Sequence, residues 1–225
     1  MSPNQKTETL LSIINLIKDQ INHSKIELDI LYNIYNLSIN FLKIDRNLDN
    51  LPSIVTIARA FFDYYAVYHL LFINGCEEER NLRQKLYLCD GYKSSLNTFE
   101  VFMEIDKDNI LKNSVEASVR SVENLKKSFP KDYSKFCTEK QLANFNWKFK
   151  SNTKNENYSW KELYELSLDR KIIAKLISEY FSLYVHGLAI QSIKIENEYF
   201  LEATNGTLDA ALLLLNSRLL KKHYS

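Results

Sequence analysis

"PSIVTIARAFFDYYAVYHLLFING", residues 52–75, is the most apolar stretch of this 225-residue chain and decides its fold. On a helical wheel its apolar and aromatic side chains point in nearly every direction, which predicts a helix buried on most sides. Pro52 suits the first turn of a helix, and Gly75 suits the left-handed position that follows a helix C-terminus. We therefore expect this stretch to form the central helix of the protein.

Amphipathic segments lie on both sides of the central helix. In them apolar residues recur every three or four positions, the spacing of one buried helix face. This pattern predicts an N-terminal helical hairpin over residues 1–44, central helices over 51–129 and C-terminal helices over 159–225. One short alternation, "SIKIENEYFLE" over 192–202, is compatible with a strand or with a bent connector.

The region over residues 130–158 differs from the rest of the chain. It is polar and dense in lysine and asparagine around Trp147 and Phe149, which predicts an irregular excursion with one short helix and a mobile loop. The whole chain contains only 4 glycines and 3 prolines, too few turn residues for a protein of many strands. The sequence therefore predicts an all-α fold, a single domain over 1–225 built as a bundle of about seven helices with one irregular polar excursion.

The composition limits the classes of function. The 29 Lys and Arg against 28 Asp and Glu leave a formal charge of +1, so any contact with nucleic acid must be local. The three cysteines show neither disulfide nor zinc spacing, and no carboxylates or histidines show metal-ligand spacing, so no metal and no cofactor is expected. The first 20 residues show no basic segment followed by a continuous apolar core, and no apolar run has membrane-spanning length, which predicts a cytoplasmic protein without a membrane partner.

The central helix carries a narrow polar strip that contains Arg59 and Asp63. A guanidinium group in so apolar a helix must be paired and hydrogen-bonded, because an unpaired buried charge is strongly destabilising. Asp63, one turn later, is the expected partner. Two interpretations remain open: a structural pair that orients the core, or an arginine that points into a cleft.

A second polar stripe lies in the C-terminal helices, in and before "SEYFSLYVHGLAIQS" at residues 178–192. It consists of Lys175, Glu179, Ser182 and His186. Either it is the solvated face of a surface helix, with Lys175 and Glu179 forming an exposed pair, or it lines a cleft shared with Arg59.

In a shared cleft the chemistry would be recognisable. His186 would be the general acid and base, since histidine moves protons near neutral pH. Arg59 would hold a phosphate through two parallel hydrogen bonds, and Ser182 would orient the ring or a substrate hydroxyl. Such a set suits metal-independent cleavage of RNA or binding of a nucleotide without cleavage. Supporting roles would fall to Asp63, Lys175, Glu179 and Tyr180.

Other polar residues are expected to be structural. His69 lies in an aromatic run and is expected in the core or an interface rather than in a catalytic site. Arg80 and Arg83 follow three glutamates and are expected to form exposed pairs that contribute little to stability.

The stretches "ARAFFDYY", residues 58–65, and "EYFSLYVHG", residues 179–187, together resemble a bacterial family of all-helical proteins, a domain of unknown function, that is itself similar to the HEPN superfamily. The resemblance covers residues 51–72 and 170–192. In that superfamily a helical bundle carries an Arg-x4–6-His motif. Many members are ribonucleases of toxin–antitoxin and antiviral defence systems, and they usually act as dimers.

The resemblance implies a helical bundle, a homodimer and an RNA-directed activity. The chain departs from the motif, because no arginine stands four to six residues before His186. Tyr180 and Ser182 occupy that window, so the role of phosphate ligand would pass to Arg59 on another helix. Two hypotheses stay open at this point: a ribonuclease or RNA-binding protein with these site residues, and a non-catalytic helical module that binds a protein partner or regulates one.

Overall fold

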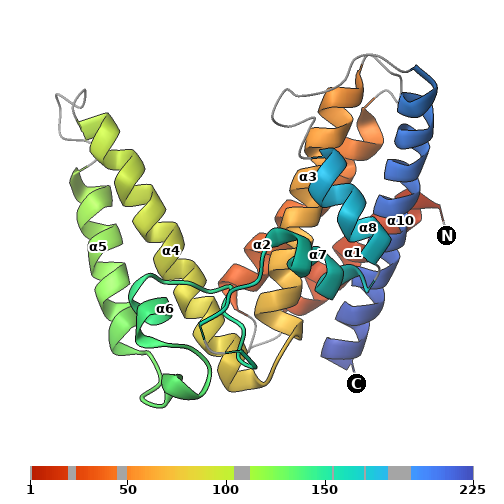
Figure 1. Ribbon diagram of the computed structural model, residues 1–225. Coiled ribbons are helices and arrows are strands. Elements are labelled where there is room, and N and C mark those ends of the chain that lie inside the picture. The colour runs from red at the N-terminus through yellow and green to blue at the C-terminus, as the bar shows by residue number, and fades with distance from the viewer. Residues whose placement is uncertain are drawn as a thin grey trace. The chain divides into compact units, whose positions relative to one another are not determined.

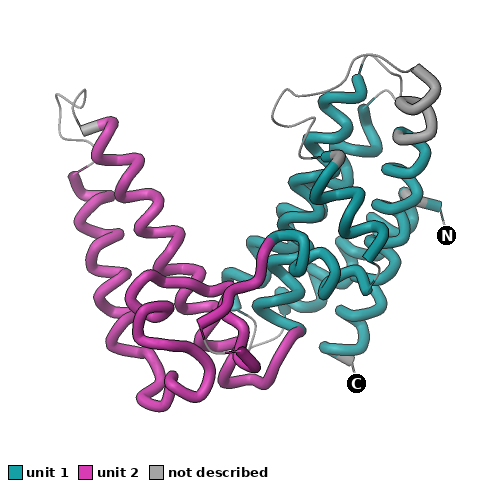
Figure 2. Tube along the Cα trace, viewed as in Figure 1, with its two compact units in different colours: residues 1–73, 160–225 teal, residues 74–159 magenta. Residues whose placement is uncertain are grey.

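The computed structural model describes residues 2–19, 24–44, 50–103, 112–153, 155–169, 171–181 and 194–224 (Figure 1). The chain groups into two compact units (Figure 2). Unit 1 comprises Met1–Ile73 and Trp160–Ser225, and unit 2 comprises Asn74–Ser159. The single domain that the sequence predicts stays a prediction, since each unit has its own buried core.

The described residues form helices and no strand, which confirms the all-α fold. Only an isolated antiparallel bridge joins Phe149 and Asn157. Unit 1 contains α1 (Pro3–Lys18), α2 (Lys25–Lys43), α3 (Leu51–Tyr68), the π-helix η2 (His69–Ile73), α7 (Trp160–Leu168), α8 (Lys171–Lys175), the π-helix η4 (Leu176–Phe181) and α10 (Lys194–Tyr224). Unit 2 contains α4 (Glu77–Met103), α5 (Lys112–Lys127), the 3-10 helix η3 (Tyr133–Lys135) and α6 (Glu139–Ala143).

The central helix of unit 1 is α3, as its apolar sequence predicts. It packs on α2, α7, α10 and η4, and it continues into η2, where His69, Leu70, Leu71 and Phe72 are buried. Phe61 and Phe62 are fully buried, and Phe62 packs on Phe181 of η4 with ring centroids 6.0 Å apart. Full burial of each such ring contributes about 1.5–3 kcal/mol. The core of unit 1 is thus assembled around α3 from both ends of the chain.

The N-terminal hairpin predicted over residues 1–44 is present. Its helices α1 and α2 pack on each other, and α1 also packs on α10. The alternation at 192–202 is neither a strand nor a connector over its described part, because Lys194 begins α10. Glutamate, lysine and leucine are good helix formers, and a helix propagates readily once its C-terminal part is packed.

A buried carboxylate joins three helices of unit 1. Glu27 of α2 is 4 % exposed, and the hydroxyl of Tyr68 donates to its Oε1 at 2.8 Å. Lys222 of α10 donates to the same oxygen, and His223 Nε2 lies 3.4 Å from it. Because a buried carboxylate must be paired, this cluster ties α2, α3 and the last turn of α10 together.

Unit 2 is a helical hairpin, α4 and α5, with the polar region folded against it. The predicted irregular excursion is found here, with α6 as its short α-helix. Trp147 stacks edge-on against Tyr87 of α4 with centroids 5.1 Å apart, and its indole N–H donates to Asp90 at 3.2 Å. The excursion is therefore anchored to α4 by its aromatic residues.

The expectation of an exposed Arg83 is wrong. Arg83 is fully buried and pairs with Glu79 at 2.5 Å. Its guanidinium donates to the carbonyl of Phe149 at 3.0 Å and to that of Asn74 at 3.3 Å, and it lies 4.7 Å from the centre of the Phe149 ring. Spacing along α4 predicts the partner but not the burial, since the residues that cover Arg83 come from the polar region.

Gly75 is required beside this buried pair. It adopts φ +86°, the left-handed conformation expected from the sequence. A Cβ atom at this position would stand 2.4 Å from Glu79 Oε2, so a side chain would displace the carboxylate that Arg83 needs.

No helix among the described residues combines the length and the apolar character that crossing a membrane requires.

The buried pair sets the stability of unit 2. Arg83→Leu leaves the Glu79 carboxylate buried without its cation, and we expect a loss of about 3–5 kcal/mol in the free energy of unfolding. Urea unfolding should be followed by the fluorescence of Trp147 in a Trp160→Phe background, because these are the two tryptophans and Trp160 belongs to unit 1. The control is Arg80→Leu, at a half-buried arginine, for which about 1 kcal/mol or less is expected. Equal losses for both variants would contradict this account.

Unit 1 is expected to lose stability in mild acid because of His69. Burial, with a smaller contribution from Arg218, lowers the pKa of His69 from 6.5 to about 3. Below about pH 6.5 His69 is therefore protonated in the unfolded chain but stays neutral in the folded chain. As a result the free energy of unfolding falls with falling pH, by up to about 1.4 kcal/mol per pH unit. His69→Leu should flatten this slope between pH 6.5 and 5 in urea unfolding followed by circular dichroism. An unchanged slope would show that His69 does not remain neutral in the folded chain.

Candidate functional site

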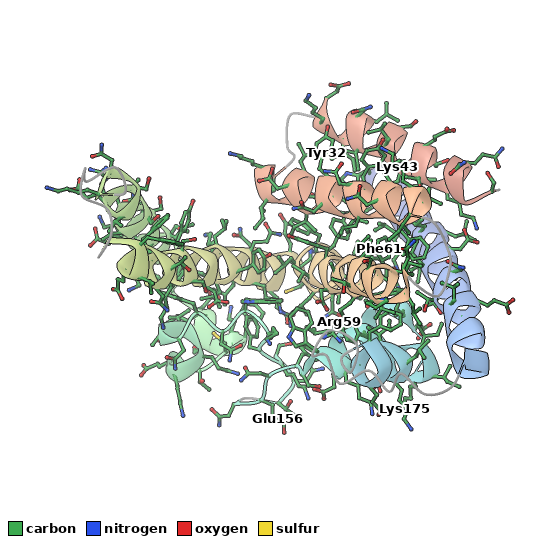
Figure 3. All side chains as sticks on the ribbon, turned by 90° about the horizontal axis from the view of Figure 1, so that it is seen from above. Tyr32, Lys43, Arg59, Phe61, Glu156 and Lys175 are labelled. Atoms are coloured by element: carbon green, nitrogen blue, oxygen red, sulfur yellow. The ribbon has the colours of Figure 1, made fainter. Side chains whose placement is uncertain are left out.

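Arg59 lies at the meeting point of three elements of unit 1. Its Nε donates to Asp63 Oδ1 at 3.0 Å, one turn along α3. One terminal nitrogen donates to the carbonyl of Ile177 in η4 at 3.1 Å, and the guanidinium lies 5.2 Å from the centre of the Tyr164 ring of α7. Figure 3 shows Arg59 on the side of α3 that faces these C-terminal helices. The expected pairing of Arg59 with Asp63 is therefore confirmed, and it is part of a larger network.

Tyr164 completes this network. Its side chain is fully buried, and its hydroxyl donates a hydrogen bond to Asp63 Oδ1. One carboxylate oxygen thus accepts from both the guanidinium and the phenol. We call Arg59, Asp63, Tyr164 and the Ile177 carbonyl the Arg59 network.

The local structure explains how these groups are held. Tyr164 follows Trp160 by one turn, and the two rings stack with centroids 6.1 Å apart. Ile177 and Phe181 of η4 are fully buried, which fixes this widened turn against α3. Single-turn π-helices are rare and occur frequently at functional sites.

Burial controls the protonation of the network. It raises the pKa of Asp63, while the hydrogen bond from Tyr164 and the charge of Arg59 act in the opposite direction. Burial and the neighbouring Asp63 carboxylate raise the pKa of Tyr164. The phenol therefore stays protonated at neutral pH and acts as a hydrogen-bond donor, not as a base.

The guanidinium keeps part of its donor capacity. Arginine has five N–H groups, of which two donate to Asp63 and Ile177. The other three have no acceptor among the described residues, and the side chain is 18 % exposed. Such a guanidinium is held in a defined orientation and can still bind an anionic oxygen.

The remaining predicted site residues are placed as follows. Lys175 and Glu179 pair at 3.9 Å with 63 % and 50 % of their side chains exposed (Figure 3), as expected for a solvated helix face. Tyr180 belongs to η4. Ser182 and His186 lie outside the described residues. The structure thus brings Arg59 and Asp63 together at η4, and the other two predicted catalytic residues follow η4 in the sequence.

Sequence reasoning missed Tyr164. It stands 101 residues after Asp63, and in the sequence it is one of 14 tyrosines on apolar stripes. The only local signal is the spacing of Trp160 and Tyr164, which puts two aromatic rings on one helix face.

In the described part of the chain, no three His, Cys, Asp or Glu side chains come together as a metal site requires. Comparisons of the sequence and the structure with protein-family models, with curated proteins and with solved structures found no match.

The Arg59 network is expected to behave as one energetic unit. Arg59→Ala and Tyr164→Phe each remove one donor from the same oxygen of Asp63, so their effects on the free energy of unfolding should be non-additive by about 0.5–3 kcal/mol. Urea unfolding of the wild type, both single variants and the double variant measures this coupling energy.

The matched control is the cycle of Lys175→Ala with Glu179→Ala on the exposed pair. Its coupling should not exceed about 0.5 kcal/mol. An Arg59 cycle that is additive within error would mean that the two hydrogen bonds to Asp63 are independent.

Proposed function

We propose that this protein is a HEPN-like, metal-independent ribonuclease of a toxin or antiviral-defence system. Arg59 binds the scissile phosphate, His186 is the general acid and base, and Ser182 supports the histidine or a substrate hydroxyl. The observation that carries the proposal is the oriented guanidinium of Arg59, with three N–H groups that no described residue accepts.

Chain geometry supports the participation of Ser182 and His186. Arg59 is hydrogen-bonded to Ile177 of η4, and η4 ends at Phe181. Ser182 and His186 follow Phe181 by one and five residues. Even a fully extended chain covers those five residues in about 18 Å, which is the upper limit on the distance between the Cα atoms of Phe181 and His186.

The reaction needs no group beyond the chain and its substrate. The ribose 2′-hydroxyl attacks the neighbouring phosphorus and His186 accepts its proton. The bond from phosphorus to the 5′-oxygen breaks, and that oxygen takes a proton from water or from His186 of a second copy of the chain in the proposed homodimer. The products are a 2′,3′-cyclic phosphate and a 5′-hydroxyl. Arg59 stabilises the additional negative charge on the phosphoryl oxygens in the transition state.

The test is induced expression in bacteria of the wild type, His186→Ala and Arg59→Ala, with growth and total RNA followed over time. We expect the wild type to arrest growth and fragment RNA, and both variants to abolish fragmentation while circular dichroism shows them folded. The purified wild type should leave 5′-hydroxyl ends in the presence of a chelator. Loss of general acid–base catalysis alone lowers the rate about 10²–10⁴-fold.

The matched control is Lys43→Ala, which removes an exposed cation from the last turn of α2 (Figure 3) and should leave fragmentation unchanged. Healthy growth and intact RNA with folded wild-type protein would count against a constitutively active ribonuclease. Fragmentation that survives His186→Ala would remove this histidine from the mechanism.

A second candidate function, a helical module that binds a protein partner, is favoured by one observation. A pocket of about 460 Å³ lies beside α10 in unit 1. Apolar residues dominate its lining, among them Leu168, Ile173 and Leu214, and Leu213 in the same lining is 51 % exposed. Exposed apolar surface of this kind marks interaction sites. Intact RNA in the expression test would favour this protein-binding function over the ribonuclease.

A further inference from the structure

A polar pocket of about 250 Å³ lies in unit 2, in the region between α6 and the Phe149–Asn157 bridge. The described residues that line it include no carboxylate and no apolar side chain. One lysine, one threonine and five amides form the lining, and the amides belong to Gln141, Asn144, Asn146, Asn155 and Asn157.

The wall of the pocket is held by hydrogen bonds. Gln141 is 5 % exposed, and its Nε2 donates to the Glu156 carbonyl at 2.9 Å and to Asn157 Oδ1 at 2.8 Å. Its Oε1 accepts from the Thr138 backbone N–H at 2.9 Å, and its carbonyl accepts from the Asn146 N–H at 2.8 Å. The pocket is therefore preformed, so a ligand would not have to order it.

Several polar groups at the pocket remain open. The side-chain amides of Asn146 and Asn155 have no partner among the described residues. The Nδ2 of Asn144 donates to the Lys140 carbonyl at 2.9 Å, and its Oδ1 has no hydrogen-bond partner among the described residues. Each open amide offers a donor and an acceptor side by side, which is the pattern that asparagine uses to bind the edge of a nucleobase.

The pocket carries one cationic side chain, Lys140, although the whole chain is nearly neutral. Lys135 and Lys150 are paired, with Asp132 and Glu156 respectively. Lys140, in contrast, lines the pocket, is exposed, and has no carboxylate partner among the described residues. The ammonium group of Lys140 could therefore neutralise a phosphate bound near the open amides.

We infer that this pocket binds a nucleotide, with the base edge on Asn146 and Asn155 and the phosphate at Lys140. The neighbouring aromatic residues Phe145 and Trp147 are buried, so the pocket recognises its ligand by hydrogen bonds and charge rather than by stacking. The source of the nucleotide is single-stranded RNA or a free nucleotide, which present the same groups. The inference rests on unit 2 alone and holds whether or not the Arg59 network cleaves RNA.

The test uses the full chain with His186→Ala, so that binding is measured without cleavage. Fluorescence anisotropy with a labelled eight-nucleotide single-stranded RNA of mixed sequence, at about physiological salt, gives the dissociation constant. We expect Asn146→Ala to weaken binding about tenfold, and Lys140→Ala to weaken it severalfold and to reduce its salt dependence by about one phosphate contact. Because neither side chain has a partner that holds the fold, both variants should retain the tryptophan emission and the circular dichroism of the parent.

Matched controls separate the pocket from general effects. Asn113→Ala removes an exposed amide from α5, and Lys131→Ala removes an exposed lysine that does not line the pocket. Asn113→Ala should leave the dissociation constant unchanged, and Lys131→Ala should weaken binding less than Lys140→Ala does. Equal effects within each matched pair, or no binding of RNA and of nucleotides by the folded chain, would overturn the inference.

Competition with nucleoside monophosphates identifies the source of the nucleotide. Displacement of the labelled RNA by a monophosphate at micromolar concentration supports a free-nucleotide site. Displacement only by unlabelled oligonucleotides supports a site for one nucleotide within a strand. The RNA fragmentation test of the Arg59 network is read separately, so either proposal can fail while the other stands.

Discussion

The buried polar side chains of a largely buried helix need hydrogen-bond partners, and in unit 1 neighbouring helices supply these partners to α3. Arg59 reaches η4, and Asp63 receives Tyr164 of α7. The Tyr65 hydroxyl accepts from Arg218 of α10 at 2.9 Å, and Tyr68 donates to Glu27 of α2. An unpaired polar group in this core would cost about 1–3 kcal/mol. The polar groups of α3 therefore select which helices surround it and how those helices are rotated.

Two arginines among the described residues pair with a carboxylate, and the difference in their burial decides which of them can bind a ligand. Arg83 is fully enclosed, with a carboxylate, two carbonyls and an aromatic ring around it, so no ligand can reach its guanidinium. Arg59 makes fewer bonds and keeps a partly exposed edge. A guanidinium that is held in place but keeps unused N–H groups is better suited to bind phosphate, because little conformational entropy is lost when the ligand binds. This difference directs the functional proposal to Arg59.

In unit 2 the polar region likewise contains both structural residues and residues that are open to a ligand. Buried aromatic residues of the polar region pack against α4, whereas four of its asparagines and Lys140 line a small pocket. A neutral chain can still attract a phosphate to a single exposed lysine, because charge attracts a ligand over about 8–10 Å at physiological salt and not over the whole molecule. Overall net charge is a poor guide to such a site.

The sequence by itself determined what depends on neighbours along the chain. Periodicity predicted the helices and the central position of α3, spacing of one turn predicted the pairing of Arg59 with Asp63, and residue type predicted the left-handed Gly75. Only the tertiary structure decided which distant groups meet: Tyr164 with Asp63, Lys222 with Glu27, and the carbonyl of Phe149 with Arg83. These partners are separated by 101, 195 and 66 residues, and local spacing carries no information over such distances. Burial is set by the segments that pack over a side chain, which is why Arg83, expected to be exposed from its neighbours along the chain, is fully buried.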